Sequence, residues 1–152
     1  MLIRLIVFLI INFGGLALAG LSTSDAVTGD WYLSLNKAPW TPPGWVFGVA
    51  WSTIMICFSI YLAKLWGELE DKQSLLLLLV PAIVLNIAWS PVFFSWQWVT
   101  FGLLIMLGLT TVVWMLFFKY RTMLGSVSYL LLPYMIWAVI ATSLNAYILI
   151  FN

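Results

Sequence analysis

The stretch from Ser74 to Ser95, SLLLLLVPAIVLNIAWSPVFFS, is apolar along nearly its whole length and carries no charged residue. An α-helix rises about 1.5 Å per residue and the hydrocarbon core of a bilayer is about 30 Å thick, so about 20 apolar residues can cross it. The unbroken apolar run from Leu75 to Val80 differs from the alternating segments of about ten residues that build membrane β-barrels. This stretch is therefore predicted to be a transmembrane helix.

Four further windows of similar length and character surround this stretch, and the whole chain has the composition of a membrane protein. Hydrophobic residues make up 64% of the 152 residues and charged residues only 7%, whereas soluble domains carry about a quarter charged residues. The sequence predicts an all-α integral membrane bundle that forms a single domain, residues 1–152. Its five transmembrane helices are expected at residues 2–21, 45–66, 74–95, 98–118 and 127–151, with one long loop at residues 22–44.

Basic residues are distributed unevenly between the two ends of these predicted helices. With five crossings, the long loop and the third loop lie on one side, which carries only Lys37. The opposite side holds the N-terminus and carries Arg4, Lys64, Lys72, Lys119 and Arg121. Because cytoplasmic loops are enriched in Lys and Arg, we expect a multi-pass protein of a bacterial cell membrane, surrounded by lipid, with a cytoplasmic N-terminus and the long loop outside.

The first window also has features of a secretory signal peptide. Arg4 precedes an apolar run, and Ala17-Leu18-Ala19 resembles a cleavage site. The apolar run is long for a signal peptide, however, and small residues also suit a packed membrane helix. A retained first helix is therefore expected.

The residue types that the chain lacks exclude several functions. It has no histidine and a single cysteine, Cys57, inside the second window, so histidine-based acid–base catalysis and histidine-ligated zinc or haem are excluded. No acidic residue lies inside a window, although ion pumps and proton-coupled exporters usually bury an ionisable residue on their pathway. A net charge of +1 gives no reason to expect a nucleic-acid partner. No metal site and no cofactor are predicted.

The long loop is rich in aromatic residues and prolines. It contains Trp31, Tyr32 and Trp40 and the rigid step Pro42-Pro43, whereas disordered loops are poor in aromatic residues. Trp and Tyr also gather at membrane–water interfaces, so simple anchoring of the loop is an alternative. Anchoring does not require prolines. The loop is therefore predicted to form an ordered cap on the bundle.

Aromatic and amide side chains are the remaining candidates for chemistry inside the bundle. Asn86, Trp89 and Phe93 share one face of the third predicted helix, and Trp137, Ala141 and Asn145 share one face of the fifth. Trp51 lies in the second helix. Taken alone, this spacing favours ordinary helix packing, with an interhelical hydrogen bond from each asparagine, over a ligand pocket.

Three groups of residues also match a known family pattern. The first is Trp31-Tyr32-x-x-Leu35-Asn36-Lys37-x-Pro39-Trp40-x-Pro42-Pro43-x-Trp45 with Gly48-x-x-Trp51. The others are Leu85-Asn86-x-x-Trp89-x-Pro91-x-Phe93-Phe94, and Pro133-Tyr134-x-x-Trp137 followed by Thr142-x-Leu144-Asn145. From the first helix to the last, the chain resembles a bacterial member of the TspO/MBR family of translocator proteins and tryptophan-rich sensory proteins.

The resemblance implies a five-helix bundle, commonly a homodimer, with a ligand site between the helices beneath the long loop. Members bind porphyrins such as protoporphyrin IX, sterols in animals, and synthetic benzodiazepine-site ligands. A flat macrocycle is well held by aromatic faces with a few polar groups. Carried over position by position, the resemblance implies a ligand-binding pocket of Tyr32, Trp40, Pro42, Trp51, Asn86, Trp89, Phe93, Trp137, Ala141 and Leu144.

The chain departs from the family pattern in two places. The family usually has Lys-Pro-x-Trp, whereas this chain has Lys37-Ala38-Pro39-Trp40, so the proline is displaced by one residue. The animal sterol motif places a basic residue after an aromatic near the C-terminus. Here Tyr147 is followed only by Ile148-Leu149-Ile150-Phe151-Asn152. Sterol binding is therefore doubtful for this chain.

Three functions remain open at this point. The first is a membrane receptor or carrier for porphyrins that acts in tetrapyrrole regulation or stress sensing. The second is an enzyme that degrades porphyrin in a light- and oxygen-dependent reaction, with Trp51 and Trp137 as candidate catalytic residues. The third is a scaffold whose output is protein contact. For the homodimer, Gly15 and Ala19 form a small-xxx-small pair that favours an interface through the first helix.

Overall fold

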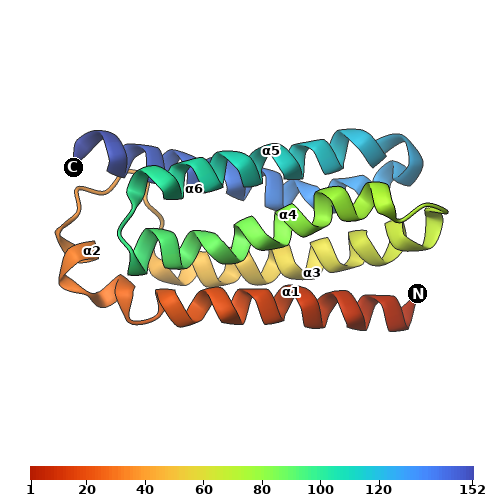
Figure 1. The fold of residues 1–152 in the computed structure, drawn as a ribbon, viewed down its shortest axis with the longest axis horizontal. Helices are drawn as coiled ribbons and strands as arrows, with labels where there is room; N and C mark the ends of the chain where they lie inside the picture. Colours follow the sequence, from red (N-terminus) through yellow and green to blue (C-terminus); the bar gives the residue numbers. More distant parts are fainter.

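The computed structural model describes residues 1–152, and every regular element in it is a helix. The long helices lie side by side along the longest axis of the molecule, with the N- and C-termini at opposite ends (Figure 1). The all-α prediction is confirmed. The five long helices are α1 (Leu2–Thr23), α3 (Gly44–Glu68), α4 (Gln73–Ser90), α5 (Val99–Leu124) and α6 (Leu132–Phe151).

Four helical stretches are long and apolar enough to cross a membrane: Leu2–Thr28, Gly44–Glu68, Gln73–Ser95 and Val99–Phe151. The last stretch, of 53 residues, contains both α5 and α6, joined by the 3₁₀ segment η3 (Gly125–Leu131). The length and composition of these stretches therefore confirm the prediction of an integral, multi-pass membrane protein.

The connection between α5 and α6 differs from the predicted one. The fourth helix was expected to end at residue 118, but α5 continues to Leu124, and α6 begins at Leu132 rather than at residue 127. The chain leaves α5 at Gly125, whose φ of +54° lies in the left-handed region that glycine adopts readily. Pro133 then lies in the first turn of α6, where a missing backbone N–H is tolerated.

At Pro91 the α-helical geometry of α4 changes to the wider turn of a π-helix. Pro81 lies inside α4 without ending it, whereas α4 ends before Pro91 and continues as the π-helical segment η2 (Pro91–Ser95). Within η2, Phe93 is 2% exposed and Phe94 7% exposed. The π-helical turn therefore directs two adjacent phenylalanines into the bundle, as π-bulges often do near functional sites.

The half of the bundle far from the long loop is tightly packed. Tyr61, Leu65, Leu75 and Leu116 are fully buried there, and the Tyr61 hydroxyl donates a hydrogen bond of 3.0 Å to the Leu116 carbonyl. Near the loop, the helix side chains of Phe47, Trp51 and Trp89 are only partly buried, and they line a cavity there. Open space in this fold therefore lies at the loop end.

Two small residues of α1, Gly15 and Ala19, face the inside of the bundle. Gly15 and Ala19 are buried within the chain, and a Cβ added at Gly15 would lie 3.3 Å from Ile87 Cδ1 on α4. The prediction that this pair mediates dimerisation is therefore wrong. The small side chains let the backbone of α1 lie close to α4 within one molecule.

Residues 24–43, called the cap from here on, connect α1 to α3 and cover one end of the bundle (Figure 1). The cap contains the short helices η1 (Ala26–Thr28) and α2 (Asp30–Ser34). Trp31 and Tyr32 pack edge-on against Phe93 and Phe94, at ring distances of 5.7 and 5.4 Å. The prediction of an ordered cap is therefore confirmed.

The C-terminal residue also holds the cap in place. The Asn36 backbone N–H donates a 2.8 Å hydrogen bond to Asn152 Oδ1, and Asn152 Nδ2 donates one of 3.2 Å to the Asn36 carbonyl. The amide of Asn152 thus pairs with the backbone of the cap as a neighbouring β-strand would. This contact brings the cap and the end of α6 together.

Candidate functional site

A cavity of about 670 Å³ lies beneath the cap. Its walls come from α1, the cap, α3, α4, η2 and α6. Small-molecule sites are typically about 300–1,000 Å³ and are mostly apolar with a few polar groups. The cavity has this size and this character.

The cavity brings together eight of the ten predicted ligand-binding residues. Trp40 and Trp137 do not line it. The eight come from the cap, α3, α4 with η2, and α6, and they are Tyr32, Pro42, Trp51, Asn86, Trp89, Phe93, Ala141 and Leu144.

One wall of the cavity is a connected aromatic surface. Trp89 and Phe93 are stacked, with ring centroids 5.1 Å apart and planes inclined by 16°. Phe94 meets Trp89 edge-on at 5.6 Å. Aromatic rings so arranged present both flat faces and edges to a guest molecule. This wall is suited to a flat, apolar ligand.

Asn145 holds this aromatic wall in position. The Trp89 indole N–H donates a 3.1 Å hydrogen bond to Asn145 Oδ1, and Asn145 Nδ2 donates a 2.9 Å bond to the Val99 carbonyl at the start of α5. Asn145 is 2% exposed, and its partners Trp89 and Val99 are half-buried. One amide therefore ties three helices together at the cavity.

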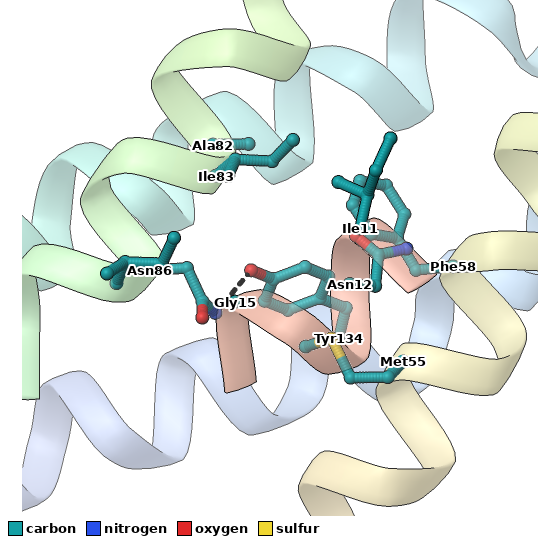
Figure 2. Close-up of a pocket in the computed structure, with 10 residues that line it drawn as sticks. Ile11, Asn12, Gly15, Met55, Phe58, Ala82, Ile83, Asn86 and Tyr134 are labelled. Atoms are coloured by element: carbon teal, nitrogen blue, oxygen red, sulfur yellow. Dashed lines mark hydrogen bonds between the residues drawn. The ribbon is translucent and has the colours of Figure 1, made fainter. Parts of the chain in front are cut away.

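Asn86 lies between the large cavity and a much smaller one. Its Nδ2 donates a 2.8 Å hydrogen bond to the Tyr134 hydroxyl, the dashed line in Figure 2. The smaller cavity, of about 20 Å³, is lined by both residues together with Asn12 and Gly15 of α1. Asn86 and Asn145 thus form the interhelical hydrogen bonds expected from packing, and both also line the large cavity.

Trp51 presents an unused hydrogen-bond donor at the cavity. Its ring meets Tyr134 edge-on at 6.1 Å, and the side chain is half-buried. Trp51 lines the cavity, but its indole N–H forms no hydrogen bond within the protein. A ligand acceptor would supply the partner that this donor lacks.

Trp137 lies behind the cavity wall. It is 6% exposed and packs edge-on against Phe47, with ring centroids 5.2 Å apart and planes at 86°. Phe47 lines the cavity and Trp137 does not. The Trp137 Nε1 atom is buried without a hydrogen-bond partner. Trp137 therefore backs Phe47 and carries an unsatisfied donor.

Trp40 fastens the cap to α6. Its side chain is 54% exposed, its Nε1 donates a 3.1 Å hydrogen bond to Ser143 Oγ, and its ring meets Tyr147 edge-on at 5.5 Å. The position of Trp40 within the loop motif does not determine the direction of its side chain. In the structure that side chain lies on the outer surface of α6.

Several residues that line the cavity were absent from the predicted pocket. They include Thr23 and Ser90, whose hydroxyls are 3.0 Å apart across α1 and α4, and Lys37 in the cap. The sequence gives little signal for the two hydroxyls, because serine and threonine are common in packed membrane helices. Lys37 carried a signal, as the one basic residue on its side of the predicted membrane.

Tyr32 is the cavity residue whose acidity is altered by its place in the cap. Burial raises the pKa of its phenol above the usual value, because the charged form is poorly solvated there. The hydroxyl is therefore neutral at physiological pH. Tyr32, which lines the cavity, can donate or accept a hydrogen bond there.

The fold and site define an all-helical membrane protein with an aromatic cavity beneath a cap, and comparison with known proteins identifies its family. The TspO/MBR family model matches residues 6–151. The protein CrtK of Rhodobacter capsulatus is 34% identical over 142 residues, which cover 89% of this chain and 86% of that protein. The human translocator protein is 32% identical over 125 residues, which cover 76% of this chain and 70% of that protein.

A third relative supports the same assignment. The tryptophan-rich sensory protein of Cereibacter sphaeroides is 33% identical over 120 residues, which cover 76% of this chain and 73% of that protein. The chain belongs to the TspO/MBR family, a family of membrane receptor and sensory proteins. The resemblance seen in the sequence motifs is therefore confirmed.

Proposed function

We propose that this protein binds porphyrins such as protoporphyrin IX in the cavity beneath the cap. In this proposal it acts as a membrane receptor or carrier with a role in tetrapyrrole regulation or stress sensing. The observation that carries the proposal is the stacked wall of Trp89 and Phe93 in a cavity of about 670 Å³. A flat macrocycle gains most from aromatic faces in a space from which water is excluded.

The polar groups of the cavity support the same ligand class. The indole N–H of Trp51 has no partner within the protein, and the Asn86 amide lies at the inner end beside Tyr134. Protoporphyrin IX carries peripheral carboxylate groups whose oxygens accept hydrogen bonds from such donors. Because the chain has no histidine, the proposed binding does not depend on a bond between imidazole and a metal.

The titration of protoporphyrin IX into the purified full chain tests this proposal through quenching of tryptophan fluorescence. Saturable binding at micromolar concentration is expected, and no saturable binding would refute it. Illumination in oxygen separates binding from the alternative enzymatic function. A receptor leaves the porphyrin absorption spectrum unchanged, whereas an enzyme bleaches many porphyrin molecules per protein molecule.

Trp51 and Trp137 are expected to differ when each is replaced by phenylalanine. Trp51→Phe removes a free donor that lines the cavity, so the porphyrin dissociation constant should rise about fivefold, or about 1 kcal/mol. Trp137→Phe removes a buried donor without a partner. It should leave affinity within about twofold, with an unchanged or higher melting temperature. Equal losses of affinity in both variants would contradict this division.

We also propose that the protein crosses the membrane five times, with its N-terminus in the cytoplasm and the cap outside. Helices α5, of 26 residues, and α6, of 20 residues, run side by side and are each long enough for one crossing. The excess of Lys and Arg at the end of the bundle far from the cap supports this orientation. A homodimer is proposed as well, through a surface other than the buried Gly15 face.

Labelling of single cysteines tests the orientation. In a Cys57→Ala background, Ser24→Cys in the cap should react with an impermeant maleimide added outside intact cells, and Ser126→Cys should not. Both serines are exposed, and Ser126 lies in η3, which precedes α6, whereas the other end of α6 contacts the cap. After the membrane is opened, both cysteines should react, which controls for accessibility. The reverse pattern in intact cells would overturn the orientation.

A further inference from the structure

The cavity beneath the cap contains one charged side chain. Among all the residues that line it, only Lys37 carries a formal charge at neutral pH, and no aspartate or glutamate lines the cavity. The two acidic residues of this region, Asp25 and Asp30, are exposed and lie outside the cavity lining. The lining of the cavity therefore carries one positive charge, in the cap, and no acidic side chain to balance it.

The Lys37 ammonium has no acidic partner within the protein. The one ion pair of the structure joins Lys64 and Glu68 at the other end of the bundle. Lys37 Nζ donates a long hydrogen bond of 3.4 Å to the Leu33 carbonyl and lies 4.6 Å from the centre of the Tyr32 ring. These contacts leave donor capacity on an ammonium that has three N–H groups.

The beginning of α3 adds to the positive potential at the same place. Gly44, the first residue of α3, lines the cavity, and the first turn of this 25-residue helix has no acidic residue and no side-chain cap. The N-terminus of a helix carries a partial positive charge. It therefore adds to the positive potential of Lys37 at the cavity, where no acidic side chain is present.

From this arrangement we propose that Lys37 binds a carboxylate of the ligand, whose flat apolar body lies against Trp89 and Phe93. The cavity thus selects planar amphipathic carboxylic acids over neutral molecules of the same shape. The inference rests on the proposed function and adds the chemical class of the ligand to it. A charged pair beside a largely apolar cavity wall is screened less than one in open water.

Protoporphyrin IX and its dimethyl ester provide a direct test, because they share the macrocycle and differ in carboxylate charge. Both are titrated into the full chain in lipid nanodiscs, with wild type, Lys37→Met and Lys37→Arg. Lys37→Met keeps most of the length of the side chain without its charge. It should weaken binding of the acid by about tenfold, as expected for one lost charged contact, and leave binding of the ester within about twofold.

Two control variants show whether the charge at position 37 is responsible. Lys37→Arg should keep the dissociation constant of the acid within about threefold of the wild-type value, because the charge is kept. Lys119→Met removes an exposed lysine at the far end of α5. It should leave the affinity for both ligands unchanged. For wild type, the preference for the acid over the ester should shrink as salt is raised from low to high concentration.

The outcomes separate this inference from the proposed function. If acid and ester bind wild type equally, or if Lys37→Met weakens both to the same extent, the carboxylate contact is refuted while porphyrin binding stands. An equal loss for both ligands would instead assign Lys37 to packing on Tyr32. If neither ligand binds wild type, the proposed function fails and this inference fails with it.

Discussion

The substitution Gly48→Phe is expected to weaken binding of protoporphyrin IX by about thirtyfold or more, equivalent to about 2 kcal/mol, without unfolding the protein. Gly48 lies in α3 and lines the cavity, and a Cβ built at this position meets no heavy atom within 4 Å. A phenyl ring there would occupy space that the macrocycle needs. Glycine is also a poor helix former, so its replacement should not lower the stability of α3.

Gly14→Phe is the matched control for this experiment. Gly14 lies in α1, also has no heavy atom within 4 Å of an added Cβ, and does not line the cavity. Both variants should show wild-type helical content and similar melting temperatures, and only Gly48→Phe should lose affinity. If Gly48→Phe is folded and binds as tightly as wild type, the ligand does not occupy this cavity.

Among the substitutions considered, Asn145→Leu is expected to lower the free energy of unfolding most, by about 2 kcal/mol. Asn145 accepts the Trp89 indole hydrogen bond and donates to the Val99 carbonyl. Leucine has a similar volume and can form neither bond, so a donor and an acceptor would be left buried without partners. Interhelical hydrogen bonds in membranes average about 0.6 kcal/mol but reach about 1.7, and two are lost here.

Porphyrin affinity should fall in the same variant, because Trp89 is no longer held in the orientation that stacks it on Phe93. Thr111→Val is the matched control, since the Thr111 hydroxyl bonds only to the Leu107 carbonyl of its own helix. The measurements are the thermal midpoint in detergent and the porphyrin titration. A midpoint equal to that of the control would show that Asn145 does not join the helices.

Much of this protein follows from its sequence. The lengths of the apolar runs determine helices that cross a membrane, because a bilayer offers the backbone no other hydrogen-bond partners. Three groups of residues at defined spacing determine the family. Helical periodicity also places Asn86, Trp89 and Phe93 on one face, and the structure finds all three at the cavity.

The tertiary structure decided which face of each helix lines the cavity and which face packs against other helices. Periodicity gives Trp137 and Ala141 a common face, yet Ala141 lines the cavity and Trp137 lies behind Phe47. The same limit explains the wrong prediction for Gly15. Its small size was consistent with contact to a second molecule, but in the structure it packs against Ile87 of the same chain. The rotation of one helix relative to its neighbours depends on how side chains from distant segments fit together, and a single helix's pattern does not contain that information.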